Sequence, residues 1–241
     1  SRLPLFLTQG LLACIPERLT KDERIKRGLV SLHEPDILKR LIKIYSFYDE
    51  GMKKKLFQPW VVAHVSTDGS EAQQALWRLQ QDVRERDPFT QMLYIDTRAN
   101  LPDDLLMVGD KMSMANSIEA RVPFLDTRIV EFVESLPPEF KMRNLQGKYL
   151  HKKAALKWLD PHIVYQKKKG FSNPVDLWLR GRMREFVNSC LLSERSAVSR
   201  YFNKTFIKEM VRRHEANEQN YLRHIYLLIS FELWHQKFIA S

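Results

Sequence analysis

The residues with the clearest chemical potential are three consecutive lysines, Lys167, Lys168 and Lys169, followed by Gly170 and Phe171. A lysine ammonium is a compact charge on a flexible stem and suits phosphate oxygens. Gly170 permits a positive φ, which can turn the loop toward a cleft. Positive charge there would stabilise the negative charge that develops on a phosphate leaving group. A solvated turn is the alternative, so the run alone leaves both interpretations open.

Glu119 and Arg121 form the second candidate, because they stand between Ile118 and the apolar residues 122–125. Charged side chains are rarely buried unless they are paired. We therefore expect the two to be partners in an apolar setting. One interpretation is an ion pair that locks the chain before Pro123, and the other is a buried carboxylate beside an acceptor substrate.

Helices are predicted to position both candidates. Residues 101–126 open with Leu-Pro-Asp-Asp, which puts Pro102 at the first helical position and acids in the first turn. Asp110 lies on this helix, either lining the same site as Glu119 or on an ordinary polar face. Asp126 is expected to cap the next helix. The predicted apolar stripe consists of Leu105, Leu106, Val108, Met112 and Met114.

Helix-start signals followed by apolar faces recur along the rest of the chain. Strand signals are weak throughout, so the predicted fold is all-α or nearly so, in a single helical domain covering residues 1–241. Besides residues 101–126, the main predicted helices cover residues 37–45, 70–83, 88–95, 127–136, 147–158, 174–192, 204–215 and 220–238.

Composition narrows the class of protein. With 241 residues, 44% hydrophobic and 28% charged, the chain is predicted to be globular. It has no apolar run of eighteen residues and no signal-peptide pattern, so we expect no membrane span and a cytoplasmic location. The two cysteines have no metal-ligand spacing, and no metal site is predicted. The net charge of +10 is spread among acids, which makes nucleic acid an unlikely partner.

Two motifs carry a resemblance to a known family. Residues 110–126 read D-K-M-S-M-A-x-S-x-E-A-R-V-P-F-L-D, and residues 168–174 read K-x-G-F-x-x-P. Together they resemble the synthetase domain of glutamine-dependent asparagine synthetases, whose superfamily includes β-lactam synthetases and lasso-peptide cyclases. Lys141 and the pair Gly147-Lys148 lie between the motifs and are also typical of the family. The resemblance is strong from residue 94 to residue 178.

The resemblance implies a reaction and roles for residues. ATP adenylates the side-chain carboxylate of aspartate, ammonia from glutamine displaces AMP, and Mg²⁺ accompanies ATP. Aligned on Phe171, the catalytic lysine falls on Lys168, with Lys167 and Lys169 as helpers or surface residues. Glu119 orders or assists the acceptor side. Gln166 stands where many members have arginine, which puts a secondary phosphate contact in doubt.

Missing motifs define which part of such an enzyme this is. The sequence contains no Gly-Gly, so the family's Ser-Gly-Gly-x-Asp-Ser pyrophosphate loop is absent. The expected chain is the helical C-terminal part of an adenine-nucleotide alpha-hydrolase-like synthetase domain without its parallel-sheet half. Its partners would be the missing glutaminase and ATP-pyrophosphatase portions, which would bind most of the ATP and Mg²⁺, and a homodimer is left open. The alternatives are a related amide-forming synthetase with another acceptor and a non-catalytic helical binding module.

Overall fold

The structure is a computed structural model that describes residues 34–65, 70–144, 146–167 and 174–240. In that part of the chain the secondary structure is helical except for one two-stranded antiparallel sheet, which confirms the nearly all-α prediction. In chain order the elements are α4 (Ile37–Tyr45), α5 (Glu50–Leu56), α6 (Pro59–His64), α7 (Ser70–Gln81), α8 (Pro88–Arg98), the π-helix η1 (Leu101–Leu106), α9 (Met107–Met114), the 3₁₀-helix η2 (Pro123–Leu125), α10 (Thr127–Ser135), α11 (Pro138–Lys141), β1 (Met142–Arg143), β2 (Gln146–Gly147), α12 (Tyr149–Ala155), α13 (Pro161–Val164), α14 (Val175–Arg180), α15 (Arg184–Leu192), α16 (Ala197–Tyr201), α17 (Lys204–Glu215) and α18 (Leu222–Phe238).

Aspartate side chains cap several helices, including the predicted cap Asp126. Asp36 accepts from the Lys39 N–H and caps α4, and Asp126 caps α10. Asp87 and Asp160 cap α8 and α13, and in both cases proline occupies the following position. Each cap satisfies an N–H group that has no partner inside its helix. Proline has no backbone N–H, and this costs nothing at the first helical position, where an N–H would have no acceptor inside the helix.

Two local predictions need correction. The helix predicted over residues 174–192 is two helices, because the backbone at Gly181 (φ −115°, ψ −107°) leaves the helical region between α14 and α15. The helix predicted over residues 147–158 starts only at Tyr149. Gly147 pairs with Met142 in the hairpin, and Lys148 has a left-handed φ of 57°.

Close contacts divide the chain into two compact units. Unit 1 comprises Ser1–Ala75 and Asn173–Ser241, and unit 2 comprises Leu76–Ser172. The prediction of one domain covering residues 1–241 stays a prediction. No helix in the described part of the chain has both the length and the hydropathy needed to cross a bilayer.

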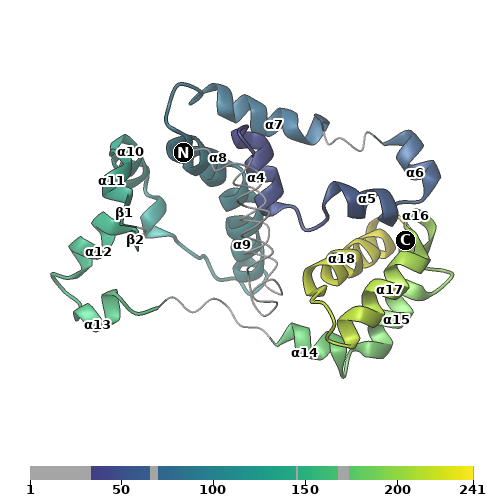
Figure 1. Cartoon of the computed structure of the whole chain (residues 1–241). Coiled ribbons are helices and arrows are strands. Elements are labelled where there is room, and N and C mark those ends of the chain that lie inside the picture. Colours follow the sequence, from purple (N-terminus) through teal and green to yellow (C-terminus); the bar gives the residue numbers. More distant parts are fainter. Residues whose placement is uncertain (1–33, 66–69, 145, 168–173, 241) are drawn as a thin grey trace. The chain divides into compact units, whose positions relative to one another are not determined.

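Unit 1 is built around a buried apolar core. Helices α15, α17 and α18 lie side by side (Figure 1). Leu191, Ile207 and Ile225 from these three helices are at most 1% exposed. The segment near α5 joins this core through backbone hydrogen bonds from Gln58 N–H to the Tyr201 carbonyl at 3.0 Å and from Asn203 N–H to the Leu56 carbonyl at 2.6 Å.

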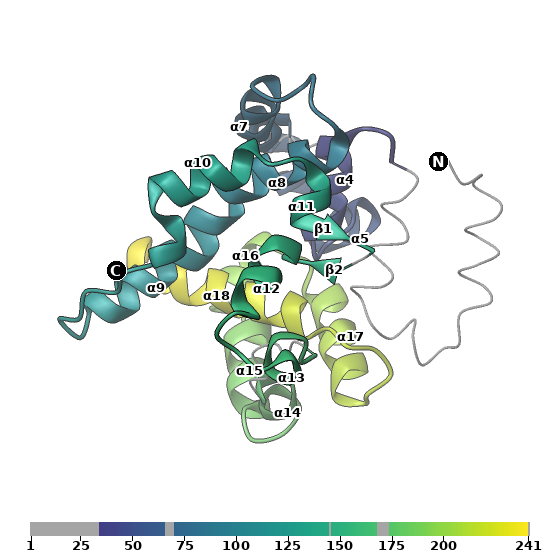
Figure 2. The same cartoon turned by 90° about the vertical axis from the view of Figure 1, so that its left-hand side faces the viewer.

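Unit 2 has almost no buried side chains. Among its described residues only Gln91 and Ile95 are buried. Its helices succeed one another along the chain, and the short hairpin β1–β2 lies between α11 and α12 (Figure 2). The packing of unit 2 therefore depends more on local hydrogen bonds and ion pairs than on an apolar core.

Candidate functional site

The motif segment, defined here as residues 110–126, begins on α9 and ends at the cap of α10. Just before it, residues 101–106 form a π-helix instead of the predicted α-helical turn. Pro102 has no N–H to donate, and the Met107 N–H donates to the Pro102 carbonyl five residues earlier. The predicted apolar stripe is on the surface, because Leu105, Val108 and Met112 are each more than half exposed.

The helix α9 ends in a tight turn that directs the chain toward Glu119. Ser117 has a left-handed φ of 57°, and the Ile118 N–H donates to the Ser113 carbonyl at 3.0 Å. A left-handed residue with a hydrogen bond back over the last turn is a common helix ending. Ser113 Oγ donates to the Asp110 carbonyl at 3.0 Å, so the predicted site residue Asp110 lies beside this turn.

Glu119 and Arg121 are partners, as predicted. Arg121 Nη2 lies 2.9 Å from Glu119 Oε1. The predicted burial is wrong, since their side chains are 69% and 82% exposed in this structure. Their apolar neighbours do not cover them, because Ile118, Val122 and Phe124 are exposed as well. The pair thus presents a carboxylate and a guanidinium on an apolar surface.

The other predicted site residues are not gathered around this pair. No hydrogen bond or ion pair joins Asp110 or the exposed Lys167 to Glu119 or Arg121 within the described residues. Lys168 and Lys169 lie outside the described residues, as does Gly170. Their roles stay predictions from the sequence.

The chain between the two motifs is strongly basic. Residues 141–167 contain seven lysines and arginines and one acid, Asp160. Arg143 lies over the Tyr149 ring at 5.4 Å and donates to its hydroxyl at 3.1 Å, and Lys152 lies 5.9 Å from the Tyr165 ring. Aromatic rings thus support cations here. Positive charge of this density favours anionic ligands.

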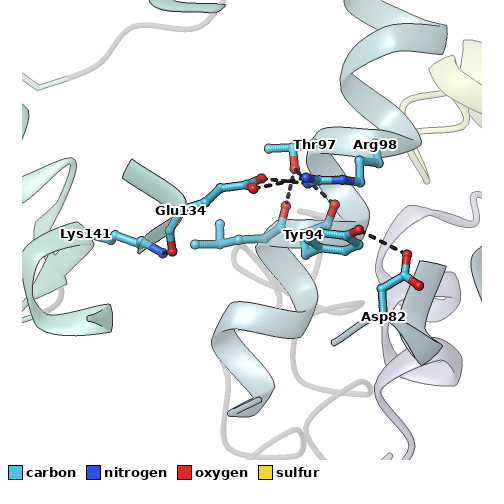
Figure 3. Close-up of polar contacts among 7 residues, drawn as sticks. Asp82, Tyr94, Thr97, Arg98, Glu134 and Lys141 are labelled. Atoms are coloured by element: carbon cyan, nitrogen blue, oxygen red, sulfur yellow. Dashed lines mark hydrogen bonds and ion pairs between the residues drawn. The ribbon is translucent and has the colours of Figure 1, made fainter. Parts of the chain in front are cut away.

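A polar cluster that the sequence analysis missed links α8 to α10 (Figure 3). Arg98 donates two hydrogen bonds to the Glu134 carboxylate, at 2.6 and 3.0 Å. The hydrogen bond to Glu134 raises the pKa of the Arg98 guanidinium, and the hydrogen bond from Arg98 lowers the pKa of the Glu134 carboxyl. The spacing of Tyr94 and Arg98, four residues apart on one helix, was the available signal. Nothing in the sequence pointed to Glu134.

The described residues do not fit a Mg²⁺ site. They contain no group of three or more histidine, cysteine, aspartate or glutamate side chains arranged to hold a metal ion. The whole sequence also lacks the paired glycines of the family's phosphate-binding loop. What the described part of the chain offers is an exposed ion pair on an apolar surface and a basic segment that leads toward Lys168.

Comparison with known proteins identifies the family. The family model for asparagine synthase matches residues 18–236. Asparagine synthetase [glutamine-hydrolyzing] 1 of Bacillus subtilis (strain 168) is 30% identical over 237 residues, covering 97% of this chain and 35% of that protein. A putative asparagine synthetase [glutamine-hydrolyzing] of Mycobacterium bovis is 30% identical over 154 residues, covering 64% of this chain and 23% of that protein.

A more distant relative is the amidase chyE of Penicillium rubens, 26% identical over 125 residues, which cover 48% of this chain and 19% of that protein. No solved structure matches the chain significantly. The chain spans about a third of the length of the Bacillus subtilis relative, and less of the others named here. Since the family model covers most of the sequence, the chain belongs to the asparagine synthase family.

Proposed function

We propose that the protein containing this chain is an ATP-dependent ligase that makes asparagine from aspartate and ammonia derived from glutamine. The family match over residues 18–236 carries this proposal, together with the motif at residues 110–126. The reaction would transfer AMP to the side-chain carboxylate of aspartate with loss of pyrophosphate, and ammonia would then displace AMP to form the amide. This chain would supply the helical part of the synthetase domain.

Lys168 is the proposed catalytic residue. Its ammonium would neutralise charge on the departing pyrophosphate and on the tetrahedral intermediate. The basic residues 141–167 support this assignment, because their charge favours anions next to that position. Lys167 and Lys169 are proposed as helpers, since only one of three consecutive side chains can point squarely into a cleft.

Glu119 and Arg121 are proposed to face the acceptor substrate, and Asp110 on α9 is proposed to contribute to the same site. Their exposure supports a binding role over a purely structural one, because the charged groups of this 2.9 Å pair remain accessible. The exposed apolar side chains of unit 2, which include Leu105, Met112 and Phe124, are proposed to pack against the portions of the enzyme outside this chain. Those portions would supply glutaminase activity and the loops that bind ATP with its Mg²⁺.

The test is pyrophosphate release by the intact protein with ATP and aspartate. We expect Lys168→Ala to lower the rate by about 10²–10³-fold, because a charge that stabilises the transition state is lost. Lys168→Arg should also be poor, since a planar guanidinium does not replace a compact ammonium. Glutamine hydrolysis should be unchanged, because it belongs to a different part of the enzyme.

Lys167→Ala and Lys169→Ala are the matched controls, and each should have a milder effect than Lys168→Ala. A larger loss in either control would move the catalytic role to that lysine. If none of the three substitutions matters, the loop is a solvated turn and the role of Lys168 is refuted. Pyrophosphate release with a different carboxylate, but not with aspartate, would favour the related amide-forming synthetases over asparagine synthesis.

A further inference from the structure

We propose that Arg98 and Glu134 are positioning residues that hold the two ends of the motif segment in place for the synthetase reaction. We call this pair the Arg98–Glu134 clamp. The inference rests on the proposed function, because it assigns the clamp a role in the site to which residues 110–126 contribute. Neither residue is proposed to touch a substrate.

Arg98 and Glu134 lie on either side of the motif segment in the chain. Arg98 is the last residue of α8, and Glu134 lies near the end of α10, 36 positions later. The π-helix η1, α9 and the whole motif segment lie between them. A contact between Arg98 and Glu134 therefore closes a loop that contains Asp110, Glu119 and Arg121.

The contact between the Arg98 guanidinium and the Glu134 carboxylate is bidentate. The guanidinium Nη1 and Nη2 donate to Glu134 Oε1 and Oε2 at 2.6 and 3.0 Å, as Figure 3 shows. Two parallel charge-assisted hydrogen bonds fix orientation as well as distance. The side chains are only 33% and 38% exposed, so water competes less with this pair than with the Glu119–Arg121 pair.

Neighbouring groups restrain Arg98 and Glu134 independently of the contact between them. The Arg98 guanidinium lies 3.6 Å from the centre of the Tyr94 ring, and the Tyr94 hydroxyl donates to Asp82 at 3.1 Å. On the other side, Lys141 Nζ donates to the Glu134 backbone carbonyl at 3.2 Å. Side chains that are already ordered lose less conformational entropy when they pair.

The loop between Arg98 and Glu134 has no buried anchor of its own among the described residues. No side chain between residues 96 and 134 is buried in the described structure. An apolar core cannot therefore fix the ends of the motif segment within unit 2. Among the described residues, the clamp joins the helices α8 and α10 that flank the segment. A small misplacement of reacting groups can lower a reaction rate strongly.

The experiment uses the intact protein that contains this chain, with Arg98→Met, Glu134→Gln and the double variant. The matched control is Arg128→Met, which also removes an arginine from an ion pair of unit 2. Arg128 pairs with Asp126, two positions away, and so closes no long loop. Arg98→Lys serves as a milder variant, because it keeps the charge and removes the paired geometry.

Two readouts separate the structural role of the clamp from its positioning role in the synthetase reaction. The first is the rate of tryptic cleavage after Arg121, relative to cleavage after Arg200 in α16. We expect each single variant to accelerate it about tenfold through local opening of the loop. The second is aspartate-dependent pyrophosphate release, where kcat should fall about ten- to a hundredfold while KM for ATP changes little.

The double variant should be no worse than either single variant, because both remove the same interaction. Additive losses would overturn the clamp, and so would cleavage rates equal to those of Arg128→Met. Faster cleavage with an unchanged kcat would overturn the positioning role. If the wild-type protein releases no pyrophosphate with aspartate, the proposed function fails. Cleavage still tests the clamp in that case, so the two failures are distinguishable.

Discussion

Unit 1 buries Leu191, Ile207 and Ile225 almost completely, whereas unit 2 leaves Leu105, Met112 and Phe124 between 61% and 68% exposed. Both units contain many apolar residues, so composition does not explain the difference. In unit 1 the helices α15, α17 and α18 share one core, and in unit 2 the Arg98–Glu134 clamp joins helices that share little packing. Unit 2, which carries the motif segment, thus leaves apolar side chains exposed to solvent.

The two units also differ in how deeply their charged groups are buried. In unit 1, the Glu232 carboxylate is only 1% exposed and accepts from the Val198 N–H at 2.9 Å and from the Gln236 amide at 2.8 Å. It thereby satisfies a donor at the start of α16. In unit 2, the Glu119–Arg121 pair faces solvent. The buried carboxylate of unit 1 has hydrogen-bond partners within the core, whereas the charged groups of the pair in unit 2 are accessible to solvent.

The largest expected difference in the free energy of unfolding is between two leucine-to-alanine variants, one in each unit. Leu191→Ala removes a fully buried side chain from unit 1 and should lower the free energy of unfolding by about 2–5 kcal/mol. Leu105→Ala in unit 2 should change it by less than about 0.5 kcal/mol, because the side chain is 61% exposed. Urea denaturation of the chain measures both. Equal losses in the free energy of unfolding for the two variants would contradict the difference in burial between the units.

A smaller change in the free energy of unfolding is expected when the pH is lowered, because of a buried histidine in unit 1. His214 is fully buried, and its Nδ1 accepts from the Tyr221 N–H at 3.1 Å. Burial and the nearby Arg180 lower its pKa from 6.5 to about 4, although Asp176 acts in the opposite direction. As pH falls below 6.5, the unfolded state takes up a proton that the folded state does not. Stability contributed by neutral His214 is therefore lost toward pH 4.

Between pH 7.5 and 5 this loss should amount to about 2 kcal/mol in the free energy of unfolding. His214→Gln keeps an acceptor for the Tyr221 N–H and cannot be protonated, so it should lack this part of the pH dependence. Urea denaturation of both proteins at the two pH values provides the measurement. An identical loss in the variant would show that His214 does not titrate as its surroundings indicate.

The smallest effect is expected for the exposed pair of the motif segment. Arg121→Met should change the free energy of unfolding by less than about 0.5 kcal/mol, because exposed ion pairs contribute little. The sequence, with its apolar neighbours, suggested a buried pair and a larger cost. A thermal-denaturation difference of several degrees would show that the pair is covered in solution. Arg128→Met, which breaks another exposed pair, is the reference variant.

Local chemistry explains which parts of the fold were predictable. Capping aspartates such as Asp87 and Asp126 define helix starts within a few residues, and α17 has the predicted bounds. The break at Gly181 was not predicted, because glycine within an amphipathic pattern is tolerated in many helices. Burial of Glu119 was predicted from its apolar neighbours, and this inference failed because those neighbours are themselves exposed. The clamp depends on residues 36 positions apart, which no local pattern reveals.

Amide hydrogen exchange, measured by mass spectrometry for this chain alone and for the intact protein that contains it, tests the central claim most directly. In the chain alone, we predict that α15, α17 and α18 exchange at least about a hundredfold more slowly than the motif segment. In the intact protein the motif segment should gain protection, because its apolar surface is covered, while the three helices change little. Equal protection of the two regions in the chain alone, or no gain in the intact protein, would contradict the account.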